Sequence, residues 1–282
     1  GEKNSISIFK SRIKGEHIVS KRFEVSTKNS LIKDASDYVS QINSKQIEVQ
    51  EKAQEIGKEK GKVIGLLKMS DDCFLTILEN GSMGVWNVDS MSCMRRITFS
   101  KDKIKEIAYC KISKSLIALA VSSAILIHEI EGDIQIGSLS GHSDRVSSLV
   151  HVGKGILVSA SLDSTMLIWD ITTSTLLGCF EESTSPVYSL AILNPNVIIS
   201  GVEHGITLWN INKRSILQEL ECSNKSSCVS QILVISSSQF FIRTCKKGRI
   251  DYFEIGDQYI FEKVKSFNYL PSIPLQMEYI NP

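Results

Sequence analysis

The feature that most constrains this chain is a repeat of about forty residues that organises its tryptophans. All three tryptophans, Trp86, Trp169 and Trp209, fall in one register, and the same spacing reaches His128 and Phe253. From position 86 onward the steps are 42, 41, 40 and 44 residues. A second marker keeps this period, because an alternating apolar segment begins at each of five positions: Val63, Ile104, Val146, Val187 and Val229. The chain is therefore built from repeated structural units.

Each unit predicts four short strands. The clearest one reads VSSLVHV, ILVSAS, MLIWDI and TLLGCF, with Gly, Asp and Ser residues at the turns between the segments. β-Branched and aromatic residues dominate the segments, as expected for strands. The pattern predicts an all-β protein.

Residues 141–171 carry a Gly-His pair, a Ser-Ala-Ser tripeptide, an Asp in a turn and a Trp-Asp pair. This segment resembles a WD40 repeat, and the match covers roughly 62–265 as five units. The resemblance implies a WD40-type β-propeller of about six to seven four-stranded blades, with one inserted amphipathic α-helix.

The resemblance also assigns a role to the polar residues of this repeat. In the family, His142, Ser159 or Ser161, Asp163 and Trp169 would form a hydrogen-bonded relay that satisfies buried polar groups. Nucleophilic catalysis would instead need an exposed nucleophile with a base and an orienting group in line. We interpret the relay as structural.

The domain prediction is a single propeller domain over 1–282, trimmed from a longer chain. Residues 1–28 supply two strands of a partial blade, 62–268 supply five recognisable blades, and 269–282 supply the closing strand of the partial blade. The shared blade then lacks its second strand. Completing one blade from both termini removes exposed sheet edges.

Residues 29–61 predict an amphipathic helix inserted between blades. One stripe at three- and four-residue steps carries the apolar side chains Leu31, Ala35, Tyr38, Ile42, Val49, Ala53 and Ile56. The stripe has three interpretations: packing on the flank of the propeller, docking onto a helix of a partner, and disorder. For the docking interpretation, Leu31, Tyr38, Ile42 and Val49 are the candidate contact residues.

The residue just before each first strand should lie on one face of a propeller. Lys62, Lys103 and Arg145 occupy this position in three consecutive units, whereas Pro186 and Cys228 follow in the next two. We call the three cations the basic arc. It is a candidate site for an acidic or phosphorylated peptide, and solvated charges without a dedicated partner are the alternative.

An adjacent pair, Arg95 and Arg96, is similar to the phosphoinositide-binding motif of PROPPIN propellers. That motif has a Gly after the arginines, and Ile97 stands here instead. Arg95 also fits an ordinary outer-strand position, so lipid-headgroup binding is a minor alternative.

Composition limits the remaining classes. The 282 residues carry a formal net charge of +1, which argues against a chain devoted to binding nucleic acid. We find neither a signal peptide nor an apolar run of the roughly 18 residues that a membrane span needs. The seven cysteines are scattered without a CxxC pair, so we expect small apolar fillers in a reducing interior, with no disulfide framework and no zinc site.

The sequence contains no glycine-rich phosphate loop, metal-spaced ligand set or nucleophile elbow, so we expect no enzyme activity and no cofactor. We predict a protein–protein interaction scaffold, a subunit of a larger eukaryotic assembly in the cytoplasm or nucleus. The alternative is a propeller component of an RNA-processing or ribosome-assembly particle that contacts phosphates. Nucleic-acid binding would weaken steeply with salt, unlike hydrophobic docking.

Overall fold

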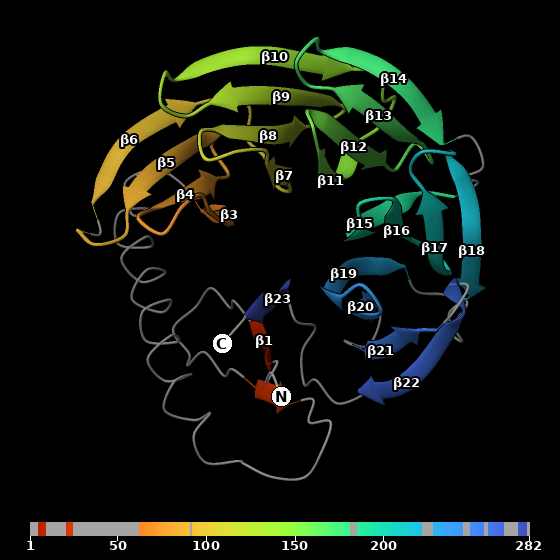
Figure 1. Cartoon of the computed structure of the whole chain (residues 1–282). Helices are drawn as coiled ribbons and strands as arrows, with labels where there is room; N and C mark the ends of the chain where they lie inside the picture. Colours follow the sequence, from red (N-terminus) through yellow and green to blue (C-terminus); the bar gives the residue numbers. More distant parts are fainter. Residues whose placement is uncertain are drawn as a thin grey trace. The chain divides into compact units, whose positions relative to one another are not determined.

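The structure, a computed structural model, describes residues 5–9, 21–24, 62–90, 92–180, 185–221, 228–244, 249–256, 259–267 and 276–280. Six antiparallel sheets account for all of the strands in these residues, five with four strands and one with three. In each four-stranded sheet the strands follow one another in chain order (Figure 1). The chain divides into two compact units, Gly1–Thr27 with His142–Pro282 and Lys28–Gly141.

The 28–141 unit contains two four-stranded sheets. The first is made of β3 (Val63–Lys68), β4 (Cys73–Leu78), β5 (Ser82–Asn87) and β6 (Cys93–Thr98). The second is made of β7 (Ala108–Lys111), β8 (Leu116–Val121), β9 (Ala124–Glu129) and β10 (Ile134–Ser140).

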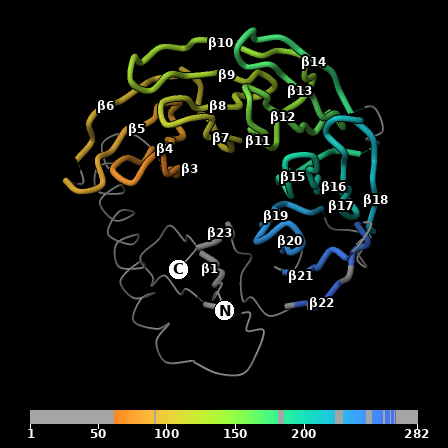
Figure 2. Tube along the Cα trace, in the orientation of Figure 1, coloured from red at the N-terminus to blue at the C-terminus, as the bar shows by residue number. Residues whose placement is uncertain are grey.

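The 142–282 unit contains three further four-stranded sheets, and Figure 2 traces the chain through all five sheets from β3 to β22. The first is made of β11 (Val146–Gly153), β12 (Ile156–Ser161), β13 (Met166–Asp170) and β14 (Thr175–Phe180). The next is made of β15 (Val187–Asn194), β16 (Val197–Val202), β17 (Gly205–Asn210) and β18 (Ser215–Glu221). The last is made of β19 (Val229–Ser236), β20 (Gln239–Thr244), β21 (Ile250–Ile255) and β22 (Phe261–Phe267).

Both ends of the chain contribute to the three-stranded sheet. β1 (Ser5–Phe9) pairs on one side with β2 (Lys21–Glu24) and on the other with β23 (Gln276–Ile280). β23 also lies against β19 of the last four-stranded sheet. From the sequence, a second strand was expected to be missing between β23 and β1. The two strands instead pair directly with each other, so no gap lies between them.

The burial of the strands explains their composition. The second strands are almost continuously buried, as in the run Leu157 to Ser161 of β12, and their residues are mostly apolar or small. The fourth strands form edges of their sheets, and β6 and β18 expose charged residues there. The turn before each of four fourth strands contains one residue with positive φ: Asp133, Ser174, Arg214 and Tyr259.

Consecutive sheets within each unit share hydrophobic cores. In the 28–141 unit, Leu75 and Met83 of the first sheet pack with Ile117 and Leu119 of the second. In the 142–282 unit, the ring of Trp209 meets that of Phe180 from the preceding sheet, with centroids 5.4 Å apart. Apolar burial between sheet faces is therefore the main stabilising term in both units.

Hydroxyl groups join the first strands of neighbouring sheets. Ser147 donates to the Val187 carbonyl, and Ser189, one repeat later, donates to the Val229 carbonyl at 2.9 Å. In the other unit, the Tyr109 hydroxyl takes this role by bonding to both the N–H and the carbonyl of Leu66.

One predicted strand boundary is wrong. Four of the five apolar markers begin a strand, but Ile104 lies in the loop before β7, which starts at Ala108. The Ile104 N–H donates to the Glu79 carbonyl at 2.7 Å, and its side chain is buried in the core shared by the two sheets. Ile104 is therefore apolar because it covers a core from a loop, and not because it begins a strand.

Two predictions lie outside what the structure describes. The inserted helix over 29–61 falls on residues beyond the described ranges, so it stays a prediction. The same holds for the single-domain organisation over 1–282, because the two units are defined separately.

The Ser189 contact yields a stability prediction. A methyl group at Gly201 would meet Ser189 Oγ at 2.3 Å and the Val229 carbonyl oxygen at 2.6 Å. We expect Gly201→Ala to lower the free energy of unfolding by about 1–3 kcal/mol in urea titrations. The double variant with Ser189→Ala should lose less unfolding free energy than the sum of the losses of the two single variants, because the clash with the Ser189 hydroxyl is gone. Additive costs would contradict this contact.

Candidate functional site

The polar residues of the third four-stranded sheet form one continuous hydrogen-bonded chain. His142, in the loop before β11, places Nδ1 2.9 Å from Asp163 Oδ2 and Nε2 2.7 Å from Ser159 Oγ. The Trp169 indole N–H donates to the same Ser159 oxygen at 2.8 Å. The structure thus joins a loop, a turn and two strands through four side chains.

In this relay, each group donates a hydrogen bond to the next, from the Trp169 indole to the Asp163 carboxylate. The indole N–H donates to Ser159, the Ser159 hydroxyl to Nε2 of a neutral His142, and Nδ1–H to the Asp163 carboxylate. Burial lowers the pKa of His142, although Asp163 opposes this shift. Burial alone would raise the pKa of Asp163, but hydrogen bonds from Thr165, Ser143 and His142 outweigh it and lower the pKa to about 2.

Ser161 has a separate role beside the relay. Its hydroxyl lies 3.0 Å from the carbonyl oxygens of Asp144 and Arg145 and accepts the Asp163 N–H at 3.1 Å. It therefore fixes the loop and the turn that carry His142 and Asp163. Thr165 contributes further bonds to Asp163 that the repeat motif did not indicate.

This arrangement is built for stability. Ser159 is fully buried, and its oxygen is engaged by both the indole and the imidazole. A nucleophile needs an approach path to a substrate, which this buried hydroxyl lacks. Among the described residues, no group of three or more His, Cys, Asp and Glu side chains is placed to hold a metal ion.

We call the tryptophan position of each unit the slot. Each slot has a counterpart on the second strand, the residue in the position that can accept a hydrogen bond from a slot indole. Two further slots pair an indole N–H with a hydroxyl, Trp86 with Thr76 at 2.9 Å and Trp209 with Ser200 at 2.8 Å. The hydroxyl always lies two residues beyond the cross-strand partner of the slot. By the same register, the slot residue Phe253 is matched by the apolar Ile242.

The slot at His128 is the exception, because the histidine there has no hydrogen-bond partner. His128 is 4% exposed, and both of its ring nitrogens are buried without one. The matching second-strand residue is Leu119, and Ile117 lies directly across. Burial lowers the pKa of His128, and the charge of Asp133 only partly opposes that shift.

The basic arc is divided between the two units. In the 28–141 unit, the Lys62 carbonyl accepts the Glu79 N–H at 2.8 Å, and Lys103 Nζ lies 2.7 Å from Glu79 Oε1. Lys103 is therefore ion-paired, and it lies five residues before β7 instead of directly before a first strand. Arg145 belongs to the 142–282 unit, where its carbonyl accepts the Leu162 N–H at 3.0 Å.

The structure describes the arginine pair but not the predicted contact residues of the 29–61 helix. Leu31, Tyr38, Ile42 and Val49 lie outside the described residues and stay predictions. The Arg95 guanidinium donates to the carbonyls of both Ile130 and Glu131, so it joins β6 to the turn between β9 and β10 of the next sheet.

Two features were missed by the sequence analysis. Asp251 on β21 is 2% exposed and forms ion pairs with Arg249 at 2.8 Å and Lys263 at 3.0 Å. No motif indicated it, since the three residues meet only when β21 pairs with β22.

Cys228 is disulfide-bonded, so the expectation of a small apolar filler is wrong there. The described cysteines Cys73, Cys93, Cys110 and Cys179 are not in disulfide bonds.

Comparison with known proteins gives partial relatives and a clear structural neighbour. No family model matches the chain. It is 28% identical over 90 residues to mitochondrial division protein 1 of Neurospora crassa, covering 31% of this chain and 14% of that protein. It is 23% identical over 175 residues to transcription factor unc-37 of Caenorhabditis elegans, covering 61% and 28%. It is 25% identical over 161 residues to autophagy-related protein 16 of Arabidopsis thaliana, covering 55% and 30%.

The chain thus spans less than a third of the length of each of these relatives. Its structure aligns with a chain from a crystal structure of the mitotic checkpoint complex with a TM-score of 0.66 and 17% identity. That alignment covers 76% of this chain and 67% of the other. This chain has the WD40 propeller fold. The predicted fold class is confirmed, and the five four-stranded sheets are its blades. The described part of this propeller holds no helix long and apolar enough to cross a bilayer.

The relay predicts unequal costs for two similar serine variants. Ser159→Ala leaves both the Trp169 indole and His142 Nε2 without a partner, whereas Ser200→Ala leaves only the Trp209 indole. An unsatisfied buried group costs roughly 1–3 kcal/mol. We expect Ser159→Ala to lower the urea midpoint of the propeller clearly more than Ser200→Ala. Equal losses would show that the His142 bond contributes nothing.

His128 predicts a loss of stability in mild acid. Because its folded pKa lies below the unfolded value of 6.5, the unfolded chain binds a proton first as the pH falls through 6.5. Stability contributed by neutral His128 is therefore present above that pH and is lost as the pH falls toward the lower folded pKa. We expect His128→Phe to flatten the decrease in unfolding free energy between about pH 7.5 and pH 5.5. His204→Gln, which removes an exposed imidazole, is the control variant.

Proposed function

We propose that this propeller is a non-catalytic interaction scaffold, an intracellular subunit of a larger assembly. The observation that carries the proposal is that the relay side chains of the third four-stranded sheet hydrogen-bond to one another, with Ser159 fully buried and His142 only 7% exposed. Fold alone does not fix function, so the support for a non-catalytic role comes from the burial of the relay side chains. The structural neighbour comes from a multiprotein complex, which supports the same conclusion.

The part of the basic arc that lies in the 28–141 unit, Lys62 with Lys103, is the first proposed contact surface, for an acidic or phosphorylated peptide. Lys62 is exposed in the 28–141 unit, and the loop before β7 exposes Lys101 and Lys105 in addition to Lys103. Since Glu79 partly neutralises Lys103, the cations that remain for an acidic partner are chiefly Lys62, Lys101 and Lys105. The apolar stripe of residues 29–61 is the second proposed contact, for a partner helix.

Affinity purification of the chain from native extract tests the scaffold proposal. We expect a defined set of proteins to copurify and to survive nuclease treatment. Loss of all of them after nuclease treatment would instead favour the nucleic-acid-associated alternative, whose binding should also fall by roughly one power of salt concentration per phosphate contact.

Two variants then separate the proposed contacts. Lys62→Glu with Lys101→Glu and Lys105→Glu should remove an acidic partner, because it reverses three exposed charges without touching the relay. Lys114→Glu, on the turn between β7 and β8, is the control and should retain every partner. Replacement of Leu31, Tyr38, Ile42 and Val49 by Ser, in a variant shown to be folded, should remove a helix-bound partner. Retention of all partners by both variants would contradict both contacts.

A further inference from the structure

Cys228 differs from the other described cysteines. It lies directly before β19, the first strand of the fifth blade, and it is disulfide-bonded. Four described cysteines are not in disulfide bonds: Cys73, Cys93, Cys110 and Cys179. The sequence has seven cysteines, and the remaining two, Cys222 and Cys245, lie outside the described residues. By elimination, the bond of Cys228 leads to one of these two.

The register of β19 and β20 favours Cys245 as the partner. Val229, the first residue of β19, lies opposite Thr244, the last residue of β20. Continued by one residue, this register brings position 245 opposite Cys228. Opposite residues of an antiparallel pair have Cα atoms about 4.5–5.5 Å apart, which is within the span of about 4.4–6.8 Å that a disulfide bridges. Cys222, in contrast, follows β18 of a different sheet.

Two other blades show how the same two positions meet. In the third blade, Arg145 directly precedes the first strand and Leu162 directly follows the second. The Leu162 N–H donates to the Arg145 carbonyl at 3.0 Å. In the first blade, the Glu79 N–H donates to the Lys62 carbonyl at 2.8 Å in the same way. The fifth blade has a cysteine at each of these positions.

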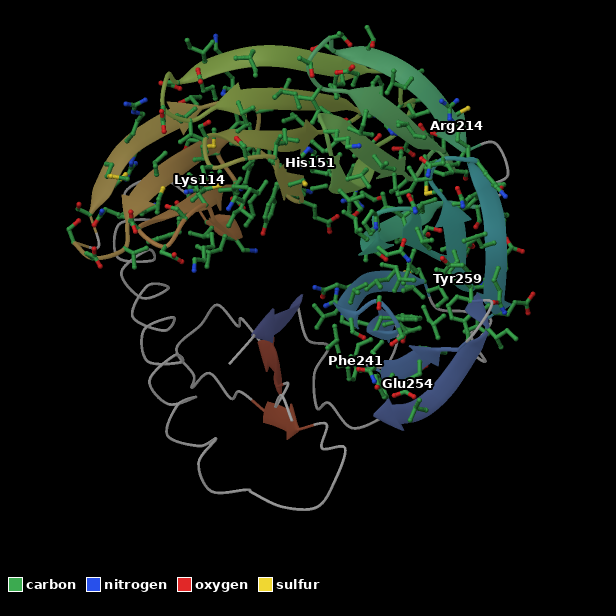
Figure 3. The ribbon with its side chains drawn as sticks, in the orientation of Figure 1. Lys114, His151, Arg214, Phe241, Glu254 and Tyr259 are labelled. Atoms are coloured by element: carbon green, nitrogen blue, oxygen red, sulfur yellow. The ribbon has the colours of Figure 1, made fainter. Side chains whose placement is uncertain are left out.

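The relay indicates what a bond at this place does. In the third blade, the hydrogen bond between His142 and Asp163 ties the loop before the first strand to the turn after the second. The fifth blade, marked by Phe241 in Figure 3, has Phe253 in the slot and Ile242 as the counterpart. It therefore lacks the indole and the hydroxyl of the relay. A disulfide between the two cysteine positions supplies a covalent tie where the third blade uses hydrogen bonds.

We propose that Cys228 and Cys245 form a reversible disulfide, a redox modification site of the fifth blade. The proposal rests on the intracellular part of the proposed function, because disulfides in intracellular proteins are usually transient and redox-sensing. As the S–S bond forms, the two thiols give up two protons and two electrons. These convert one molecule of oxidised glutathione, a small-molecule disulfide, into two molecules of reduced glutathione. The reverse step removes the covalent tie between β19 and β20.

Peptide mapping of the full chain tests the pairing. The chain is purified without reductant, its free thiols are alkylated, and it is digested with trypsin. Trypsin cuts after Lys225 and Arg243, so each of the three cysteines falls on its own peptide. We expect mass spectrometry to find the Cys228 peptide joined to the Cys245 peptide. A link to the Cys222 peptide would overturn the pairing.

Reversibility is measured by equilibrating the full chain in mixtures of reduced and oxidised glutathione and counting the alkylated thiols by mass. We expect two further thiols to be alkylated once reduced glutathione dominates. The melting temperature should then fall by about 5 °C or more, because the disulfide no longer constrains the unfolded chain. Cys245→Ser should remove both responses, and the matched control Cys222→Ser should keep them.

The outcomes separate this proposal from the scaffold function. A disulfide that stays closed when reduced glutathione dominates would overturn the redox role, and so would responses that Cys245→Ser retains. Copurification of partner proteins is measured independently, so either result would leave the scaffold function standing. Conversely, absence of copurifying proteins would reject the scaffold without changing the mapped disulfide.

Discussion

The interaction on which the blades depend is the match between the slot residue of the third strand and its counterpart on the second. Where the slot holds tryptophan, a hydroxyl of Thr76, Ser159 or Ser200 accepts the indole N–H. Where it holds Phe253, the counterpart is the apolar Ile242. A buried donor without an acceptor is costly, so a tryptophan in the slot requires a hydroxyl on the second strand. The blade of His128 lacks such a match, because Leu119 occupies the second-strand position and both imidazole nitrogens are buried without a hydrogen-bond partner.

The same position organises the surroundings of each blade. The slot ring of Trp209 packs against the preceding blade, and the fourth strand bulges opposite every slot. That bulge releases one apolar side chain from the ladder and exposes it. The packing of the slot side chain and the exposure of an apolar residue on the fourth strand thus occur at the same position of each repeat.

Most of this architecture was predictable from the sequence because it is periodic. The tryptophan register located the third strands, and the WD40 resemblance placed His142, Asp163 and Trp169 in one relay. Features that depend on pairing between strands were not predictable. The Asp251 cluster forms only across β21 and β22, and the bulges arise from register shifts that leave no mark in composition. Ile104 misled the strand assignment because a loop residue over a core is as apolar as one in a strand.

The central claim is that slot and counterpart act as a unit, and a double-mutant cycle in the fourth blade tests it. Ser200→Ile should leave the Trp209 indole unpaired and Trp209→Phe should leave the Ser200 hydroxyl unpaired, whereas the double variant has the apolar match of Phe253 and Ile242. The measurement is the free energy of unfolding of the four proteins in urea. We expect the double variant to cost less than the sum of the single variants by about 1 kcal/mol or more. Costs that simply add would contradict the claim.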